Sequence, residues 1–319
     1  MPSGDPRPPL DPVLKKILDA TPFDLAPELG VEESRRRLHA LRSGTVLPEL
    51  RAVRIENREI DGPAGRIPIR IYWPEQPRST LPPLTMYFHG GGFAVGDLDS
   101  HDSQGRQHAI KGDTVVVSVD YRLAPEHPFP AGLEDCWAAT QWAVANAGEL
   151  KADGTRLAVA GDSAGGNLAA SVAQIARDKS GPTIAFQLLW YPPTMWDPAM
   201  PSLRVNADGP VITTKDLEVF YRWYAGDLDE MNPPLYMAPA RTPDLTGLPP
   251  AYIATAGHCP LRDDGIKYAA LLADADTDVQ LHNAESLCHA FLGYYGAVPA
   301  ATEVADLGYT ALRTALHHN

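Results

Sequence analysis

Six residues near the middle of the chain, Gly161-Asp162-Ser163-Ala164-Gly165-Gly166, have the types and spacing of a nucleophile turn. A serine with glycines two positions before and after it, between a strand and a helix, is held with its hydroxyl exposed. The turn is so tight that a side chain at either glycine would collide with neighbouring backbone. The amide of Ala164, at a helix N-terminus, can then face the negative charge that develops in acyl transfer. Ser163 is therefore a candidate nucleophile.

The flanking residues help to distinguish a nucleophile turn from a chance match and from a phosphate-binding loop. The apolar run 157–160 is typical of a buried strand, and Leu168, Val172 and Ile175 share one face of the helix that would follow. This strand–turn–helix context reduces the weight of the alternative that the Gly-x-Ser-x-Gly motif is a chance match in a loop of small residues. A phosphate-binding loop is excluded, because Asn167 stands where such a loop needs lysine.

A second glycine-rich loop, His89-Gly90-Gly91-Gly92, directly follows an apolar run that ends at Phe88. Glycine amides can point into a site without obstruction by a Cβ atom. A dinucleotide-binding loop does not fit, because Val95 stands where the last glycine or alanine is required. We therefore expect the amides of Gly91 and Gly92 to join that of Ala164 in an oxyanion hole, with His89 anchoring the loop.

A serine nucleophile needs a base, and the base in this kind of fold comes last in the chain, after the nucleophile and the acid. His289-Ala290-Phe291 follows the last apolar strand pattern by a short loop, so His289 is the expected base. The other candidate histidines are less suitable as the base. His282 lies at a strand end, His258 precedes the acid in chain order, and His317 and His318 are in the C-terminal tail.

Four motifs together resemble those of the bacterial hormone-sensitive-lipase-like carboxylesterases. They are residues 89–92, 161–166 and 289–291 above, and Tyr121-Arg122-Leu123-Ala124-Pro125-Glu126-His127-Pro128-Phe129-Pro130-Ala131. The resemblance implies an α/β-hydrolase fold with a helical cap, hydrolysis of short- to medium-chain acyl esters, and no cofactor or metal. It also implies that the 121–131 loop is structural and that Glu126 and His127 are not catalytic.

The chain departs from this family where the triad acid should be. The family usually reads Asp-Pro-Leu-x-Asp-Glu, whereas this chain reads Cys259-Pro260-Leu261-Arg262-Asp263-Asp264. Four interpretations stay open. Cys259 leaves a Ser163–His289 dyad with impaired catalysis; Asp263 or Glu285 replaces the carboxylate; Cys259 ionises against a protonated His289; or Cys259 pairs with Cys288 in an oxidised off-state.

Outside the motifs, the apolar pattern predicts how the chain is organised. Alternation over residues 53–72 around Asp61-Gly62-Pro63 predicts an antiparallel hairpin. Strands then alternate with helices, which implies a mostly parallel sheet with helices on both faces. We expect strands at 84–88, 114–119, 157–160, 184–190, 251–256 and 279–281, and helices at 131–145, after Ser163, at 265–273 and at 301–316.

Two segments fall outside this alternation. Residues 10–43 carry two helical patterns that cannot form a core alone, and residues 194–240 are too long for a simple connection. We expect both to cover the strand ends where ligands bind, with Trp223 and Tyr224 lining an apolar pocket. The predicted division is N-terminal cap helices at 1–50, a catalytic domain at 51–193 and 241–319, and an inserted cap segment at 194–240.

Composition limits the classes of partner. The net charge of −13 and the absence of a basic patch argue against nucleic acid and anionic membranes. No apolar run reaches the roughly 18 residues of a membrane span, and Met1–Pro9 has no apolar core typical of a signal peptide. Three cysteines (Cys136, Cys259 and Cys288) fit neither a disulfide scaffold nor a zinc site. We expect a cytoplasmic protein with a small ester as substrate, and keep a homodimer as an open alternative.

Overall fold

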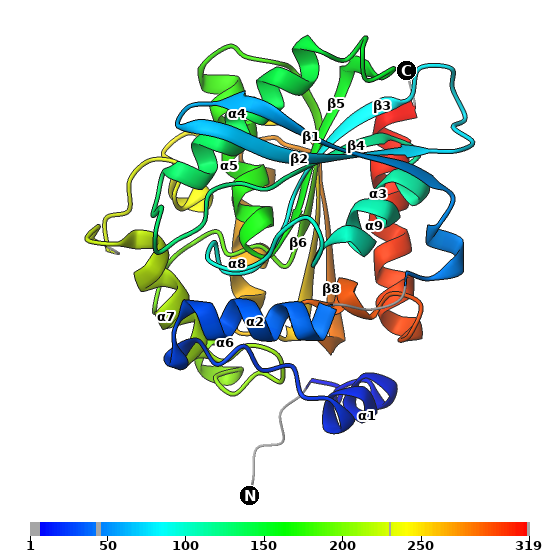
Figure 1. Ribbon diagram of the computed structural model, residues 1–319. Coiled ribbons are helices and arrows are strands. Elements are labelled where there is room, and N and C mark those ends of the chain that lie inside the picture. The colour runs from blue at the N-terminus through cyan, green and yellow to red at the C-terminus, as the bar shows by residue number, and fades with distance from the viewer. Residues whose placement is uncertain (1–6, 43–45, 230, 318–319) are drawn as a thin grey trace, which may run out of the picture.

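A mixed sheet of eight strands runs through the middle of the part of the molecule that the computed structural model describes, residues 7–42, 46–229 and 231–317 (Figure 1). Its strand order is β1-β2-β4-β3-β5-β6-β7-β8. The strands are β1 (Val53–Gly62), β2 (Gly65–Pro74), β3 (Pro83–Phe88), β4 (Val115–Val119), β5 (Asp153–Asp162), β6 (Ile184–Trp190), β7 (Ala251–His258) and β8 (Val279–Cys288). β1, β2 and β4 pair in antiparallel register, and the other neighbours pair in parallel. The predicted sheet is thereby confirmed.

Helices cover both faces of this sheet. Figure 1 shows α3 and α9 on one face and α4, α5 and α8 on the other, while α2, α6 and α7 lie together beyond the end of the sheet at which α9 begins. The α-helices are α1 (Pro12–Ala20), α2 (Val31–Arg42), α3 (Asp102–Gly112), α4 (Ala131–Ala145), α5 (Ala164–Asp178), α6 (Pro201–Val205), α7 (Thr214–Ala225), α8 (Arg262–Asp274) and α9 (Pro299–His317). Short 3-10 helices are η1 (Pro27–Leu29), η2 (Pro48–Leu50), η3 (Pro239–Arg241) and η4 (Phe291–Tyr294).

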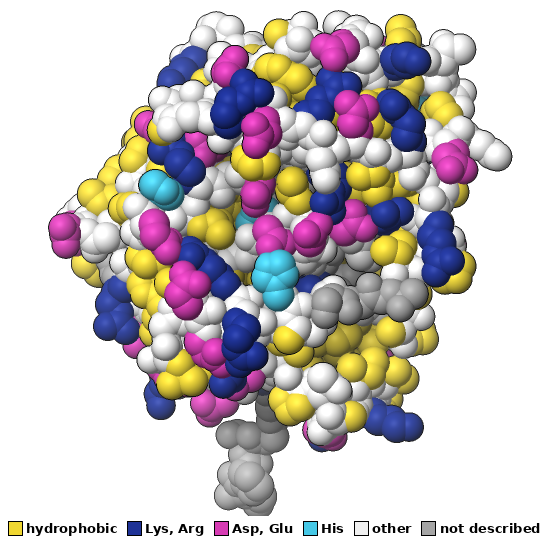
Figure 2. Space-filling model, viewed as in Figure 1, with side chains coloured by type: hydrophobic (Ala, Val, Ile, Leu, Met, Phe, Trp, Pro, Cys, Tyr) yellow, Lys and Arg dark blue, Asp and Glu magenta, His cyan; other side chains and the backbone are white. Residues whose placement is uncertain are grey.

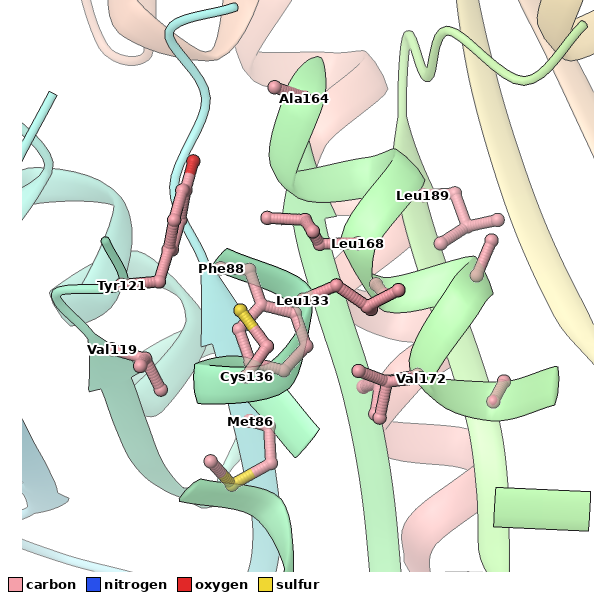
Figure 3. Packing of buried hydrophobic residues seen from close by; sticks show 14 of the residues in the cluster. Met86, Phe88, Val119, Tyr121, Leu133, Cys136, Ala164, Leu168, Val172 and Leu189 are labelled. Carbon is pink, nitrogen blue, oxygen red and sulfur yellow. The ribbon is translucent and has the colours of Figure 1, made fainter. Parts of the chain in front are cut away.

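Burial on both faces explains the composition of the central strands. Every residue of β3 and of β4 is buried, so these strands are mostly apolar and show no alternation of apolar and polar residues. Figure 3 shows Met86, Phe88 and Val119 of the sheet packed against side chains of α4 and α5. Cys136 of α4 belongs to this cluster and is fully buried, as expected for a small apolar side chain.

Local sequence sets the start of the helices near the strand ends. The Asp11 carboxylate accepts hydrogen bonds from the amides of Val13 and Leu14 and caps α1. Thr213 and Asp216 form a reciprocal capping box at α7. These caps satisfy amides that the first turn of a helix leaves without partners.

Three elements differ from the sequence-based prediction. β5 starts at Asp153, four residues before the predicted start. β8 extends to Cys288, seven residues beyond the predicted end, because its partly polar residues pair with β7 along their length. The helix α3 was not predicted, because its buried positions include polar side chains such as Gln104 and His108. The predictions for residues 1–6 and for His318 lie outside the described residues.

Candidate active site

Ser163 lies on the tight turn between β5 and α5, with φ 53° and ψ −121°. A Cβ atom at Gly161 would overlap the carbonyl of Gly165, and one at Gly165 would overlap the carbonyl of Phe88. The close approach of these backbones explains why the sequence has glycine at both positions. The turn places the hydroxyl at the carboxyl end of β5, among the loops that follow β3, β7 and β8.

His289 follows β8 directly and reaches the serine. Its Nε2 lies 2.9 Å from the Ser163 Oγ. Burial lowers the pKa of His289 to about 4; the nearby Asp162 carboxylate raises it, and the Arg42 guanidinium lowers it further. The imidazole is therefore neutral near pH 7, which is the form that can accept a proton.

Cys259 follows β7 and contacts the other nitrogen of the same ring. Its Sγ lies 3.1 Å from the His289 Nδ1 and accepts a hydrogen bond of 3.3 Å from the Leu261 amide. Burial raises the pKa of the Cys259 thiol well above its ordinary value, which opposes the interpretation as a thiolate. Cys259 and Cys288 are both free, so the structure holds no disulfide between them.

The carboxylates considered as replacements for the acid have other partners. Asp263 accepts hydrogen bonds from the Ser202 amide at 2.9 Å and from the Arg262 Nε at 2.8 Å. Glu285 is exposed to solvent. Among the described residues neither side chain hydrogen-bonds to His289, so the geometry does not support the surrogate interpretation.

The glycine loop lies beside the serine. Gly91 and Gly92 have φ of 122° and 57°, and a Cβ atom at Gly91 would overlap the carbonyl of Val95. Both glycines line the cavity that contains Ser163 and His289. Within the described part of the chain, no protein acceptor takes the amide of Gly91, Gly92 or Ala164. These amides remain available to an acceptor on a ligand.

His89 anchors this loop through contacts of its backbone carbonyl and its ring with Tyr121 and Gly90, and not through a contact with Ser163. The Tyr121 hydroxyl donates to the His89 carbonyl at 2.7 Å, and the two rings stack with centroids 4.3 Å apart. The His89 Nδ1 lies 2.9 Å from the Gly90 carbonyl oxygen. Tyr121 starts the loop expected to be structural, whose Glu126 pairs with Arg35 at 2.8 Å.

Sequence reasoning missed the role of Asp162, next to the serine. Its buried carboxylate accepts hydrogen bonds from the Tyr87 hydroxyl at 2.6 Å and the Gly90 amide at 3.0 Å. The His101 Nε2 lies 3.8 Å from the Asp162 Oδ2. Asp162 thereby ties the serine turn to the glycine loop. The aspartate in the Gly-Asp-Ser-Ala-Gly motif was the available signal.

The remaining histidines have partners away from the serine. The His258 Nε2 lies 3.0 Å from the Pro8 carbonyl, and the His317 Nε2 lies 3.0 Å from the Asp113 carbonyl. His282 is half-buried on β8. Of the histidines that the structure describes, His289 is the one that hydrogen-bonds to Ser163.

The cavity at Ser163 is small, about 50 Å³. The expectation that Trp223 and Tyr224 line it is wrong, because neither is among the residues around the cavity. Tyr224 stacks on Phe93 with ring centroids 3.7 Å apart. The apolar lining instead comes from the N-terminal segment and from the segment around α7, namely Phe23, Leu25, Leu38, Val211, Ile212 and Phe220.

The described ranges contain neither a metal-binding cluster nor a membrane-spanning helix. No group of three or more His, Cys, Asp or Glu side chains there could hold a metal ion. None of the helices in the described residues combines the length and apolar character that crossing a bilayer requires. On the face shown in Figure 2, acidic and basic side chains are interspersed.

Comparison with known proteins gives matches along the whole chain. Residues 85–293 match the family model described as alpha/beta hydrolase fold. Esterase LipI of Mycobacterium tuberculosis is 55% identical over 316 residues, covering 99% of this chain and 98% of that protein. Carboxylesterase NlhH of the same organism is 49% identical over 317 residues, with 98% of each covered.

A solved structure extends the likeness to three dimensions. The hyperthermophilic esterase from the archaeon Pyrobaculum calidifontis superposes with a TM-score of 0.86 at 34% identity, covering 96% of this chain and 99% of that one. These relatives agree with the resemblance inferred from the four motifs. The chain belongs to the alpha/beta hydrolase family.

Proposed function

We propose that this chain is a carboxylic ester hydrolase that cleaves short- to medium-chain acyl esters through an acyl-enzyme on Ser163. The observation that carries the proposal is the hydrogen bond of 2.9 Å between Ser163 and His289, on a cavity also lined by Gly91 and Gly92. The relatives named esterase and carboxylesterase support the same class of reaction.

In this mechanism the Ser163 Oγ attacks the ester carbonyl carbon while the His289 Nε2 takes its proton. The carbonyl oxygen becomes negative and accepts hydrogen bonds from the amides of Gly91, Gly92 and Ala164. Each such donor contributes about 2.7–4 kcal/mol to the stability of the transition state. The imidazolium then protonates the leaving alcohol, and water activated by the same ring releases the acid.

Cys259 weakens this cycle in a specific way. To act as a base at Nε2, a neutral His289 must carry its proton on Nδ1. A carboxylate beside Nδ1 only accepts hydrogen bonds and so enforces this tautomer, whereas a protonated thiol can also donate its proton to Nδ1. In that second arrangement Nε2 carries the proton and cannot accept one from Ser163.

A second weakness is electrostatic. The imidazolium that forms during attack is buried, and the thiol at Cys259 supplies no negative charge to stabilise it. Asp162, whose charge raises the pKa of His289, compensates in part. We therefore propose an active but impaired Ser163–His289 dyad, the first of the four interpretations.

We also propose that residues 1–50 and 194–240 act as a cap over the catalytic domain at 51–193 and 241–319. In support, the cavity at Ser163 has Phe23 and Leu38 from the first segment and Phe220 from the second in its lining. Both segments would then shape the space available to the acyl chain.

The test is covalent labelling of Ser163 by a fluorophosphonate together with hydrolysis of p-nitrophenyl acetate. We expect labelling and turnover in the wild type and neither in Ser163→Ala. Turnover no faster than in Ser163→Ala would contradict the proposal. That result would favour a second function, a ligand-binding protein of the same fold whose triad is disabled by Cys259.

Amide and lactone hydrolysis use the same groups, so matched anilides and lactones belong in the same assay. A cytoplasmic location is proposed as well, because the three cysteines are free and buried as in a reducing compartment. Cell fractionation tests the location, and light scattering tests the homodimer that the sequence left open.

A further inference from the structure

A second cavity, of about 640 Å³, lies next to the small one at Ser163, and Arg42 at the end of α2 lines both. Its other walls come from β1, β2, α3 and the chain after His289. The larger cavity has more than ten times the volume of the smaller one. It is therefore large enough to take the part of an ester that does not fit beside Ser163.

The charges on its walls do not balance. Three arginines line the cavity together with two aspartates. Arg70 pairs with Asp99 at 2.7 Å, and Arg106 pairs with Asp102 at 2.6 Å. Among the described residues Arg42 has no ion pair, so the positive charge in excess belongs to Arg42.

The Arg42 side chain also leaves hydrogen-bonding capacity unused. Its Nε is buried without a hydrogen-bond partner among the described residues, and the guanidinium lies 5.8 Å from the Phe23 ring centroid. A Cβ atom at Gly293 would come within 2.6 Å of its Nη1, so the glycine leaves room for the guanidinium. Unpaired buried polar groups are rare in native proteins and call for an explanation.

A second unpaired group lines the same cavity. Gln104 is 1% exposed, and its Oε1 has no hydrogen-bond partner in the described part of the chain. Rotation of the amide can present either its oxygen or its nitrogen to a ligand. A carboxylate in this cavity would accept two parallel hydrogen bonds from the Arg42 guanidinium and a further one from the Gln104 nitrogen.

We propose that Arg42 is a specificity-determining residue, which binds the carboxylate of an ester whose acyl or alcohol half carries an anionic group. That half occupies the larger cavity while the ester carbonyl lies at Ser163. The inference rests on the proposed ester hydrolysis and adds the substrate class to it.

The experiment compares charged and neutral esters of matched shape. Monoethyl adipate against ethyl hexanoate tests the acyl half, and 4-acetoxybenzoate against 4-acetoxybenzamide tests the alcohol half. In Arg42→Gln we expect the charged-to-neutral ratio of kcat/KM to fall about 10-fold or more for at least one pair, mainly through KM. Arg42→Lys keeps the charge without the planar fork and should lie between.

Arg36→Gln is the matched control. Arg36 lies on the same helix with a side chain that is 67% exposed and pairs with Glu33, so this variant should keep the wild-type ratios. If Arg42→Gln changes the charged and the neutral ester equally in both pairs, or changes neither, the inference is overturned.

Calorimetry on Ser163→Ala separates this inference from the proposed reaction. We expect monoethyl adipate to bind this variant, and to bind about 10-fold or more weakly when Arg42→Gln is added. Equal binding to both proteins would overturn the role of Arg42. If the wild type does not hydrolyse the ester but binding still depends on Arg42, the proposed ester hydrolysis is contradicted and the role of Arg42 stands.

Discussion

The Cys259 Sγ lies 3.1 Å from the His289 Nδ1, at the position from which a carboxylate would fix the tautomer of that ring. The imidazole keeps its contact of 2.9 Å with Ser163 on the other side. Ser163, His289 and Cys259 therefore have the geometry of a catalytic triad, but the third member is a neutral thiol instead of a carboxylate. This relationship makes the activity adjustable by a single substitution.

Replacing that thiol by a carboxylate is expected to raise kcat. In Cys259→Asp the new side chain would accept hydrogen bonds from the Leu261 amide and from Nδ1–H, and would stabilise the imidazolium. Loss of the acceptor charge in a serine protease lowers kcat by about 10⁴, which sets an upper bound for the gain here. The measurement is steady-state hydrolysis of p-nitrophenyl acetate.

Cys259→Ala is the control for this substitution, because it removes the sulfur without supplying a charge. We expect it to keep a rate near that of the wild type. An unchanged or lower rate in a folded Cys259→Asp protein would show that another carboxylate already supports His289.

The pH dependence of kcat/KM follows from the pKa of His289. Burial lowers this pKa from 6.5 to about 4, and the base must be neutral to act. As the pH is lowered, kcat/KM should therefore stay constant until the pH approaches 4, as long as the protein stays folded. In Cys259→Asp, stabilisation of the imidazolium raises the pKa of His289 and moves the acid limb to higher pH. A wild-type limb near pH 6.5 would contradict the first expectation.

The serine turn, the glycine loop and the base could be predicted because each is a local motif at a strand end. Gly161, Gly165 and Gly91 are required by close backbone contacts, so their spacing carries the geometry. The order of the motifs then placed His289 last. A parallel sheet brings the ends of β3, β5 and β8 to one edge, and there the Ser163–His289 contact forms.

The rest depends on contacts between segments far apart in the chain. Phe23 and Phe220 are separated by nearly two hundred residues, and no local pattern indicates that both line one cavity. Arg42 lies at the end of α2, and the helical pattern of residues 10–43 does not indicate that its side chain lines a cavity. The excess positive charge of the larger cavity follows from the folded structure, in which Arg70 and Arg106 form ion pairs with aspartates. Tertiary packing, rather than helical periodicity, decides these roles.

Adding one methyl group at the serine turn should be strongly destabilising. In Gly165→Ala the new Cβ would overlap the Phe88 carbonyl oxygen, so α5 must move away from β3. Overpacking of this kind costs typically about 1–3 kcal/mol in the free energy of unfolding. Chemical denaturation measures it. Gly148→Ala is the control, because a Cβ there meets no atom of the described residues within 4 Å. Equal costs for the two variants would contradict the packing argument.

Phe220 is expected to limit the length of the acyl chain. It is 2% exposed, lines the cavity of about 50 Å³ at Ser163, and faces Gly92, where a Cβ would overlap its ring. Phe220→Ala removes this wall, at a cost in stability of about 3–5 kcal/mol. The ratio of kcat/KM for p-nitrophenyl octanoate to that for the acetate should rise by at least about 10-fold, because each additional methylene that can be buried contributes roughly 1–3 kcal/mol.

Trp223→Ala separates the enlarged cavity from a general loosening of α7. Trp223 is on the same helix and contacts the Phe220 ring edge-on at 5.5 Å between centroids, but it does not line the cavity. Its removal should leave the octanoate-to-acetate ratio near the wild-type value, because the wall beside Ser163 stays in place. If Trp223→Ala shifts the ratio as far as Phe220→Ala does, the chain-length limit comes from the mobility of the helix and not from the Phe220 side chain.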